Sequence, residues 1–85
     1  MRVYLIETNP HPWELGGGYL LKATKDRNVA RMFCVNYVRD NTSGTPEQIE
    51  AAVKAWEEEF ETFVPAGANA EGDLITCFVI EVEDH

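Results

Sequence analysis

The segment from Asp40 to Gln48 constrains the fold of this chain more than any other. A run of turn-forming residues at 40–44 is followed directly by Thr45-Pro46-Glu47-Gln48. A threonine with glutamine three residues later is the pattern of a capping box, and proline is favoured at the first position of a helix. We therefore predict that one helix ends near residue 39 and that another begins at Pro46.

The second of these helices should extend from Pro46 to about Phe63. Apolar residues recur along it at the spacing of one helix face, which predicts that this face supplies much of the core. They are Ile49, Val53, Trp56, Phe60 and Phe63.

The first helix should begin at Thr24 or Asp26, because either side chain can cap a helix, and should run to about Arg39. Its apolar stripe is expected to consist of Ala30, Phe33, Cys34, Tyr37 and Val38. Cys34 and Cys77 are the only cysteines. Two cysteines are too few for a disulfide framework, and we expect both to be buried free thiols.

Three segments have the composition of β-strands. Residues 2–8 and 19–23 should pair as antiparallel neighbours, and the third strand covers residues 74–82. This third strand is apolar on both sides. One face carries Leu74, Phe78, Ile80 and Val82, which we assign to the core, and the other carries Ile75, Cys77 and Val79. Something should cover this second face, either the proline-rich loop that contains Trp13, a partner protein or a second copy of the chain.

A chain of 85 residues is expected to form one domain with a small core. The predicted elements follow one another in the order strand, strand, helix, helix, strand (ββααβ). We therefore predict a single α+β domain over residues 1–85, in which a three-stranded antiparallel sheet packs one face on two helices.

The charge of the chain is strongly asymmetric. The formal net charge is −8, every lysine and arginine lies at or before Lys54, and the 31 residues after it carry nine carboxylates. Such a surface attracts cationic partners and repels nucleic acid and anionic membranes. We therefore expect a basic protein partner, and neither direct nucleic-acid binding nor membrane binding.

The sequence lacks the signatures of catalysis and of cofactor binding. Nucleophilic catalysis needs a base held against a hydroxyl or thiol, but His11 lies between two prolines and His85 is the last residue. The glycines at 16–18 precede a strand-like segment rather than the helix of a phosphate-binding loop, and no Cys or His spacing suggests zinc. We predict a protein that is not an enzyme and uses no metal or cofactor. No apolar run is long enough to cross a bilayer, so we expect a cytoplasmic protein.

Four glutamates stand close together near the end of the second predicted helix. They are Glu57, Glu58, Glu59 and Glu61. The helix macrodipole already places partial negative charge at this end, so each carboxylate should cost a few tenths of a kcal/mol. Two interpretations remain open: a solvated face, or a surface that fits a basic groove, because carboxylates at phosphate-like density can occupy a site for DNA or RNA.

Four scattered segments together carry a resemblance to a known family: Val3-Tyr4-Leu5-Ile6, the glycines before Tyr19-Leu20-Leu21-Lys22-Ala23, Tyr37-Val38-Arg39-Asp40 and Thr76-Cys77-Phe78. They resemble the small phage-encoded anti-CRISPR proteins, which are short, acidic and non-enzymatic. The nearest type is the inhibitor that plugs the HNH nuclease domain of type II-C Cas9. The resemblance implies that an acidic loop residue, here Glu14, and a hydroxyl, here Thr76, would reach the nuclease site. The family has aspartate and serine at these positions, and Trp13 adjoins Glu14 in the loop.

We therefore expect an acidic, non-enzymatic inhibitor that binds a nucleic-acid-handling enzyme such as a CRISPR effector or another nuclease, in the host cell if the protein is phage-encoded. Its expected partner-binding residues are Trp13, Glu14, Glu57, Glu58, Glu59, Glu61 and Thr76. The alternative is a structural or assembly subunit, such as a homodimer formed through the second sheet face at Ile75, Cys77 and Val79.

Overall fold

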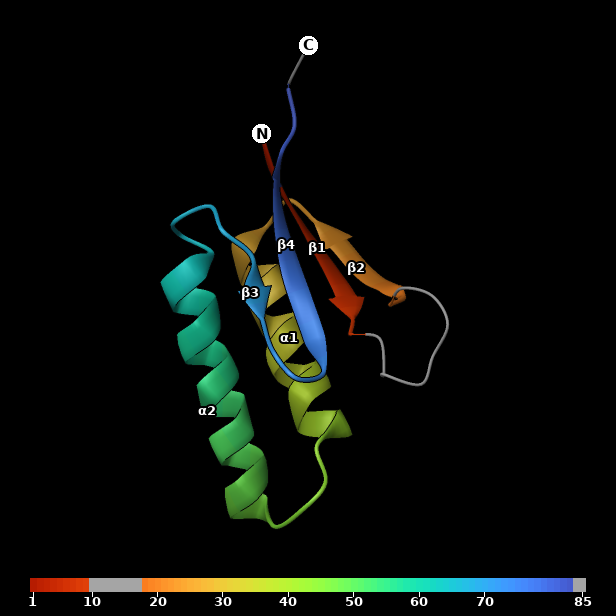
Figure 1. The fold of residues 1–85 in the computed structure, drawn as a ribbon, viewed down its shortest axis with the longest axis vertical. Coiled ribbons are helices and arrows are strands. Elements are labelled where there is room, and N and C mark those ends of the chain that lie inside the picture. Colours follow the sequence, from red (N-terminus) through yellow and green to blue (C-terminus); the bar gives the residue numbers. More distant parts are fainter. Residues whose placement is uncertain (10–17, 84–85) are drawn as a thin grey trace.

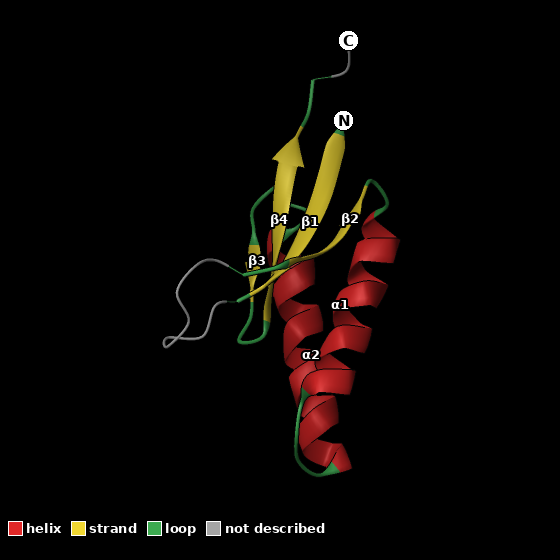
Figure 2. Cartoon of the chain, turned by 90° about the vertical axis from the view of Figure 1, so that its right-hand side faces the viewer, coloured by secondary structure: helices red, strands yellow, loops and turns green. Residues whose placement is uncertain are grey.

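The computed structural model describes residues 1–9 and 18–83 of the chain. Its elements are β1 (Arg2–Thr8), β2 (Leu20–Thr24), α1 (Arg27–Asn41), α2 (Pro46–Phe63), β3 (Ala70–Glu71) and β4 (Ile75–Glu81). The two helices lie side by side on one face of the sheet (Figures 1 and 2). The predicted α+β class is confirmed.

The sheet has four strands where we predicted three. Its order is β2-β1-β4-β3, and each neighbouring pair is antiparallel. The expected pairing of the first two strands is confirmed. The extra strand β3 places Ala70 opposite Cys77 and Glu71 opposite Thr76, so the element order is ββααββ. Two residues are too few to show the alternation from which strands are predicted, which explains why this strand was missed.

Both helices begin where the capping signals are. The Asp26 carboxylate accepts hydrogen bonds from the backbone N–H groups of Asn28 and Val29, at 2.8 and 3.2 Å. Asp26 is thus the cap, not Thr24, and α1 continues to Asn41, two residues past the predicted end. At α2 the capping box of Thr45 and Gln48 is present, with proline in the first turn. The predicted second helix is confirmed with its bounds.

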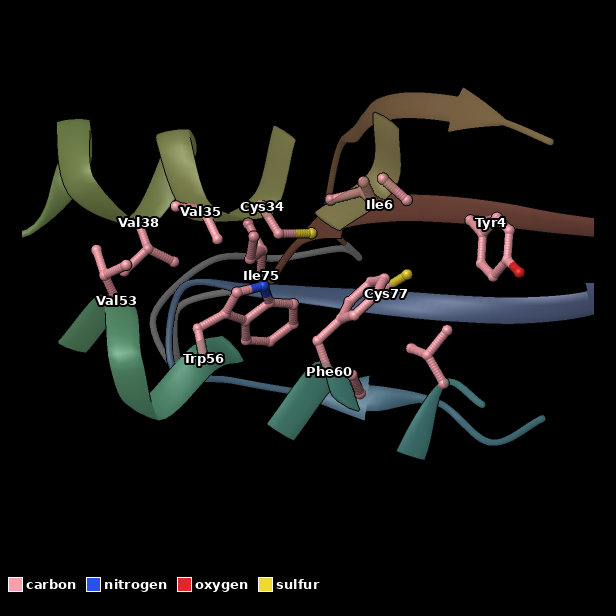
Figure 3. Close-up of a cluster of buried hydrophobic side chains, with 13 residues drawn as sticks. Tyr4, Ile6, Cys34, Val35, Val38, Val53, Trp56, Phe60, Ile75 and Cys77 are labelled. Atoms are coloured by element: carbon pink, nitrogen blue, oxygen red, sulfur yellow. The ribbon is translucent and has the colours of Figure 1, made fainter. Parts of the chain in front are cut away.

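The core lies between the helices and the sheet (Figure 3). Helix α2 buries Val53, Trp56 and Phe60, as its apolar stripe predicts. Phe63 is 40% exposed, so its assignment to the core was wrong. Helix α1 buries Ala30, Cys34, Val35 and Val38, and Phe33 and Tyr37 are partly buried against the core.

Within β4 the two faces are the reverse of the prediction, although Leu74, which directly precedes the strand, is partly buried against the core as predicted. Ile75 and Cys77 are fully buried beneath the helices, with Ile6 directly opposite Cys77 on β1. Val79 is partly buried against the same core. These residues therefore cannot form a homodimer surface in the folded chain. The strand is apolar on both sides, so alternation alone could not tell which face lies under the helices.

The opposite face of the sheet, called the open face below, is partly exposed in the described part of the chain. Leu5 pairs with Phe78 and Val3 with Ile80 on this face, because residues directly opposite each other in an antiparallel pair point the same way. Ile80 is 39% exposed and Leu20, which pairs with Glu7, is 58% exposed. Among residues 1–9 and 18–83, no helix or strand covers this face (Figure 2).

Candidate functional site

The glutamates of α2 have different surroundings on the two sides of the helix. Glu57 lies 3.9 Å from the Arg31 guanidinium, and Glu61 forms an ion pair with Arg27. Both arginines belong to α1. A helix turns about 100° per residue, so Glu58 and Glu59 project in other directions. The predicted cluster of four glutamates is therefore not one surface.

The arginines of α1 neutralise the side of α2 that faces them. Besides the two pairs above, Arg39 Nε lies 3.0 Å from a carboxylate oxygen of Glu50, and this contact raises the pKa of the Arg39 guanidinium. Arg27 also lies 5.7 Å from the centroid of the Phe60 ring, a cation–π geometry. The interface between the helices thus combines apolar packing with a row of exposed ion pairs.

A pocket of about 490 Å³ lies on the other side of α2. It is a half-open hollow bordered by the two helices, the loop that joins them and the turn between β3 and β4. That turn lies at the end of the sheet beyond which both helices extend (Figure 1). The apolar wall of the pocket consists of Val38, Ala52, Ala55, Trp56, Leu74 and Ile75. The polar residues that line the pocket are Asn41, Thr42, Ser43, Glu59, Glu71 and Asp73.

The pocket carries negative charge that no basic residue offsets within residues 1–9 and 18–83. Glu59, Glu71 and Asp73 line it, and no lysine, arginine or histidine is among its lining residues. Within the described part of the chain, none of these three carboxylates forms an ion pair. The pocket therefore differs from the α1 side of α2, where three glutamates have arginine partners.

Gly72 allows the β3–β4 turn to reach the pocket wall. A Cβ atom at Gly72 would lie 2.7 Å from Cε3 of Trp56, which is closer than carbon atoms can pack. The Gly72 N–H donates to the Ile75 carbonyl at 3.0 Å and closes the turn. The glycine thus lets Glu71 and Asp73 flank a close contact with α2.

Thr76 has a structural contact at its hydroxyl. The side chain is only 7% exposed, and its Oγ1 donates to Oδ1 of Asn9 at 2.6 Å. The Asn9 amide in turn donates to the Gly72 carbonyl. Thr76 therefore connects the end of β1 to the β3–β4 turn. Its predicted contact with a nuclease stays a prediction. The other two predicted site residues, Trp13 and Glu14, lie outside the described residues.

Cys34 and Cys77 are free and fully buried, as predicted. The neighbouring Cys77 thiol and burial together raise the pKa of Cys34 well above that of a free cysteine. The indole nitrogen of Trp56 lies on the side of Cys34 and Ile75 (Figure 3) and, among residues 1–9 and 18–83, is buried without a hydrogen-bond partner. The indole N–H acts to lower the pKa of Cys34, but the Cys77 thiol and burial outweigh it and disfavour the thiolate.

Among residues 1–9 and 18–83, no three His, Cys, Asp or Glu side chains are grouped so that they could hold a metal ion. In the same part of the chain, no helix is both long and apolar enough to span a bilayer.

The pocket beside α2 includes Glu71 and Asp73, which the sequence analysis did not single out as site residues. Their separation from Glu59 along the chain concealed that the three share a pocket.

Comparison of the chain with protein-family models, with curated proteins and with solved structures found no match. The resemblance to anti-CRISPR proteins therefore stays a prediction.

Proposed function

We propose that this protein is a non-enzymatic binding protein whose acidic surface docks on a basic, nucleic-acid-handling enzyme and inhibits it. The observation that carries the proposal is a set of carboxylates around the pocket that form no ion pair with any described residue: Glu59, Glu71 and Asp73. Glu58 adds a further exposed carboxylate on α2. These groups can pair with a partner's cations without first breaking an internal salt bridge.

The charge of the whole chain supports the same function. A net charge of −8 on 85 residues creates a long-range field that speeds the encounter with a basic surface. Enzymes that act on DNA or RNA present such surfaces to phosphates. The specific form of the proposal is an anti-CRISPR protein of a phage, which acts in the cytoplasm of the host cell and blocks a CRISPR effector or another nuclease.

The proposal is tested by capturing partners from a bacterial lysate with the tagged protein. A salt-sensitive complex should be retained at about 0.05 M salt and lost at about 0.5 M, because screening shortens the range of charge attraction. The captured enzyme should act on nucleic acid and lose activity when the pure protein is added. Capture that is independent of salt, or an enzyme that the protein does not inhibit, would contradict the proposal.

Charge reversal gives the matched control. A variant with lysine at Glu58, Glu59, Glu71 and Asp73 should lose both capture and inhibition. Circular dichroism should show that its fold is retained, since all four side chains are at least partly exposed. A variant that still captures and inhibits the same enzyme would show that these carboxylates are not the docking surface.

A second candidate is a structural or assembly subunit that associates through the open sheet face. The observation that favours it is the exposure of Leu20, Ile80 and Val82, of which Val82 is 40% exposed. Sedimentation equilibrium over a range of concentrations would reveal self-association, and Ile80→Lys should then shift the protein to monomer. A concentration-independent monomer would exclude a homodimer.

A further inference from the structure

We propose that the pocket beside α2 receives an arginine side chain of the protein partner. Its guanidinium would lie among Glu59, Glu71 and Asp73, and its methylene groups would lie along the apolar wall at Trp56 and Leu74. The inference rests on the proposed function, because it names the group by which a basic partner would be recognised.

The size and composition of the pocket fit such a ligand. A volume of about 490 Å³ lies within the range of pockets that bury small ligands, about 300–1,000 Å³. It can therefore accept one long side chain together with part of its neighbours. An apolar wall with carboxylates is complementary to a side chain that has a hydrocarbon stem and a cationic head.

The charge of the pocket is available to a partner. The arginines of α1 that lie near α2 are engaged elsewhere, by Glu50, Glu57 and Glu61. Folding has thus neutralised one side of α2 and left the carboxylates of the pocket without ion pairs in the described part of the chain. Glu59 is the one half-buried carboxylate of the three, and its position beside an apolar wall lowers the local dielectric and strengthens its attraction for a cation.

Arginine fits this arrangement better than lysine does. The three carboxylates come from α2 and from the β3–β4 turn, and a guanidinium offers five N–H donors in a planar fork that can contact more than one of them. It is also more weakly hydrated than an ammonium group, so it loses less on approaching the wall of Trp56.

The test uses a defined probe, N-acetyl-Leu-Arg-Leu-amide, titrated into the ¹⁵N-labelled full chain and followed by two-dimensional NMR. The matched control peptide has citrulline in place of arginine, which keeps the shape and removes the charge. Amide shifts should change at residues 52–59 and 71–75, and the citrulline peptide should bind more weakly. Shifts that map elsewhere, or equal binding of the two peptides, would overturn the inference.

Variants separate the pocket from the general charge of the surface. Each of Glu59→Gln and Asp73→Asn should weaken binding of the arginine peptide about two- to fivefold, the range expected for one partly exposed ion pair. The control Glu47→Gln changes the net charge equally at an exposed residue outside the pocket and should have little effect. If all three variants weaken binding equally, the peptide responds only to the overall charge of the chain, and the pocket has no special role.

Failure of this inference is distinguishable from failure of the proposed function. No shift with the arginine peptide, together with salt-sensitive capture of an enzyme that the protein inhibits, would reject the pocket and keep the docking function. Binding of the peptide in the pocket without capture or inhibition of any such enzyme would reject the docking function and keep a site for arginine.

Discussion

Two isoleucines of β4, Ile75 and Ile80, lie on opposite faces of the same sheet. Ile75 is 0% exposed and packs under the helices, whereas Ile80 is 39% exposed on the open face. Their chemistry is the same, so the difference comes entirely from the elements placed over each face. The comparison teaches that in a strand with apolar residues on both sides, tertiary packing rather than residue type decides which side chains stabilise the fold.

The largest expected effect tests this comparison directly. Ile75→Ala should lower the free energy of unfolding by about 2–5 kcal/mol, because it leaves a cavity in a closed core. Ile80→Ala removes the same atoms from a partly solvated site and should cost less than about 1 kcal/mol. Urea denaturation of both variants measures the difference. Similar costs would mean that something covers the open face as well.

A smaller effect is expected where the β3–β4 turn meets the helix side of the sheet. Gly72→Ala places a Cβ atom 2.7 Å from Cε3 of the buried Trp56, and overpacking of this kind costs about 1–3 kcal/mol. In a Trp56→Leu background the clashing ring atoms are absent. The cost of Gly72→Ala should then shrink, and a double-mutant cycle by thermal denaturation would show the coupling. If Gly72→Ala destabilises the protein equally in both backgrounds, the contact with the Trp56 ring is not the cause of the destabilisation.

The buried thiols on the helix side of the sheet make the free energy of unfolding depend on pH. The Cys77 thiol and burial raise the pKa of Cys34 in the folded protein, so the unfolded chain releases this proton at a lower pH than the folded one. The protonated Cys34 thiol makes its full contribution to the free energy of unfolding below the unfolded pKa of about 8.5. Above that pH the free energy of unfolding falls by about 1.4 kcal/mol per pH unit. Denaturation between about pH 7 and pH 10 measures this slope.

The matched control for the pH effect replaces both cysteines by alanine. This variant should be less stable at neutral pH because of lost packing, but its stability should change little between about pH 8.5 and pH 10. An unchanged slope would assign the loss of stability to other groups. The open face carries no cysteine among the described residues, so no such dependence is expected from it.

The helices and three of the strands could be predicted because their signals are local. Capping residues and a periodic apolar stripe act within one element, and α2 follows its capping box and stripe from Pro46 to Phe63. The orientation of β4 could not be predicted in this way. It depends on the register that sets Cys77 opposite Ile6 beneath the helices, and both possible faces were equally apolar. Phe63 was wrongly assigned to the core because the apolar stripe of α2 continues past Phe60 to the last residue of the helix, where the side chain is 40% exposed.

The candidate site was less predictable than the fold because it is assembled from distant segments. The sequence showed Glu59 within a run of glutamates and gave no sign that Glu57 and Glu61 would pair with arginines some 30 residues earlier in the chain. Pairing across a helix interface depends on how two helices pack, which local patterns do not encode. The uncompensated charge therefore had to be located from tertiary structure.

The smallest expected effect extends the comparison to the two sides of α2. Glu61→Gln removes the ion pair with Arg27 and should lower stability by less than about 1 kcal/mol, the usual range for an exposed pair. Glu58 forms no ion pair within the described residues and stands three residues before Glu61, a like charge at the spacing of neighbours on a helix surface. Glu58→Gln should therefore raise stability by a few tenths of a kcal/mol. Thermal denaturation at low salt should show these opposite signs, and both effects should shrink when salt is added, since both arise from screened surface charges. Equal effects of the two substitutions would mean that the arginines of α1 do not distinguish the two sides of the helix in solution.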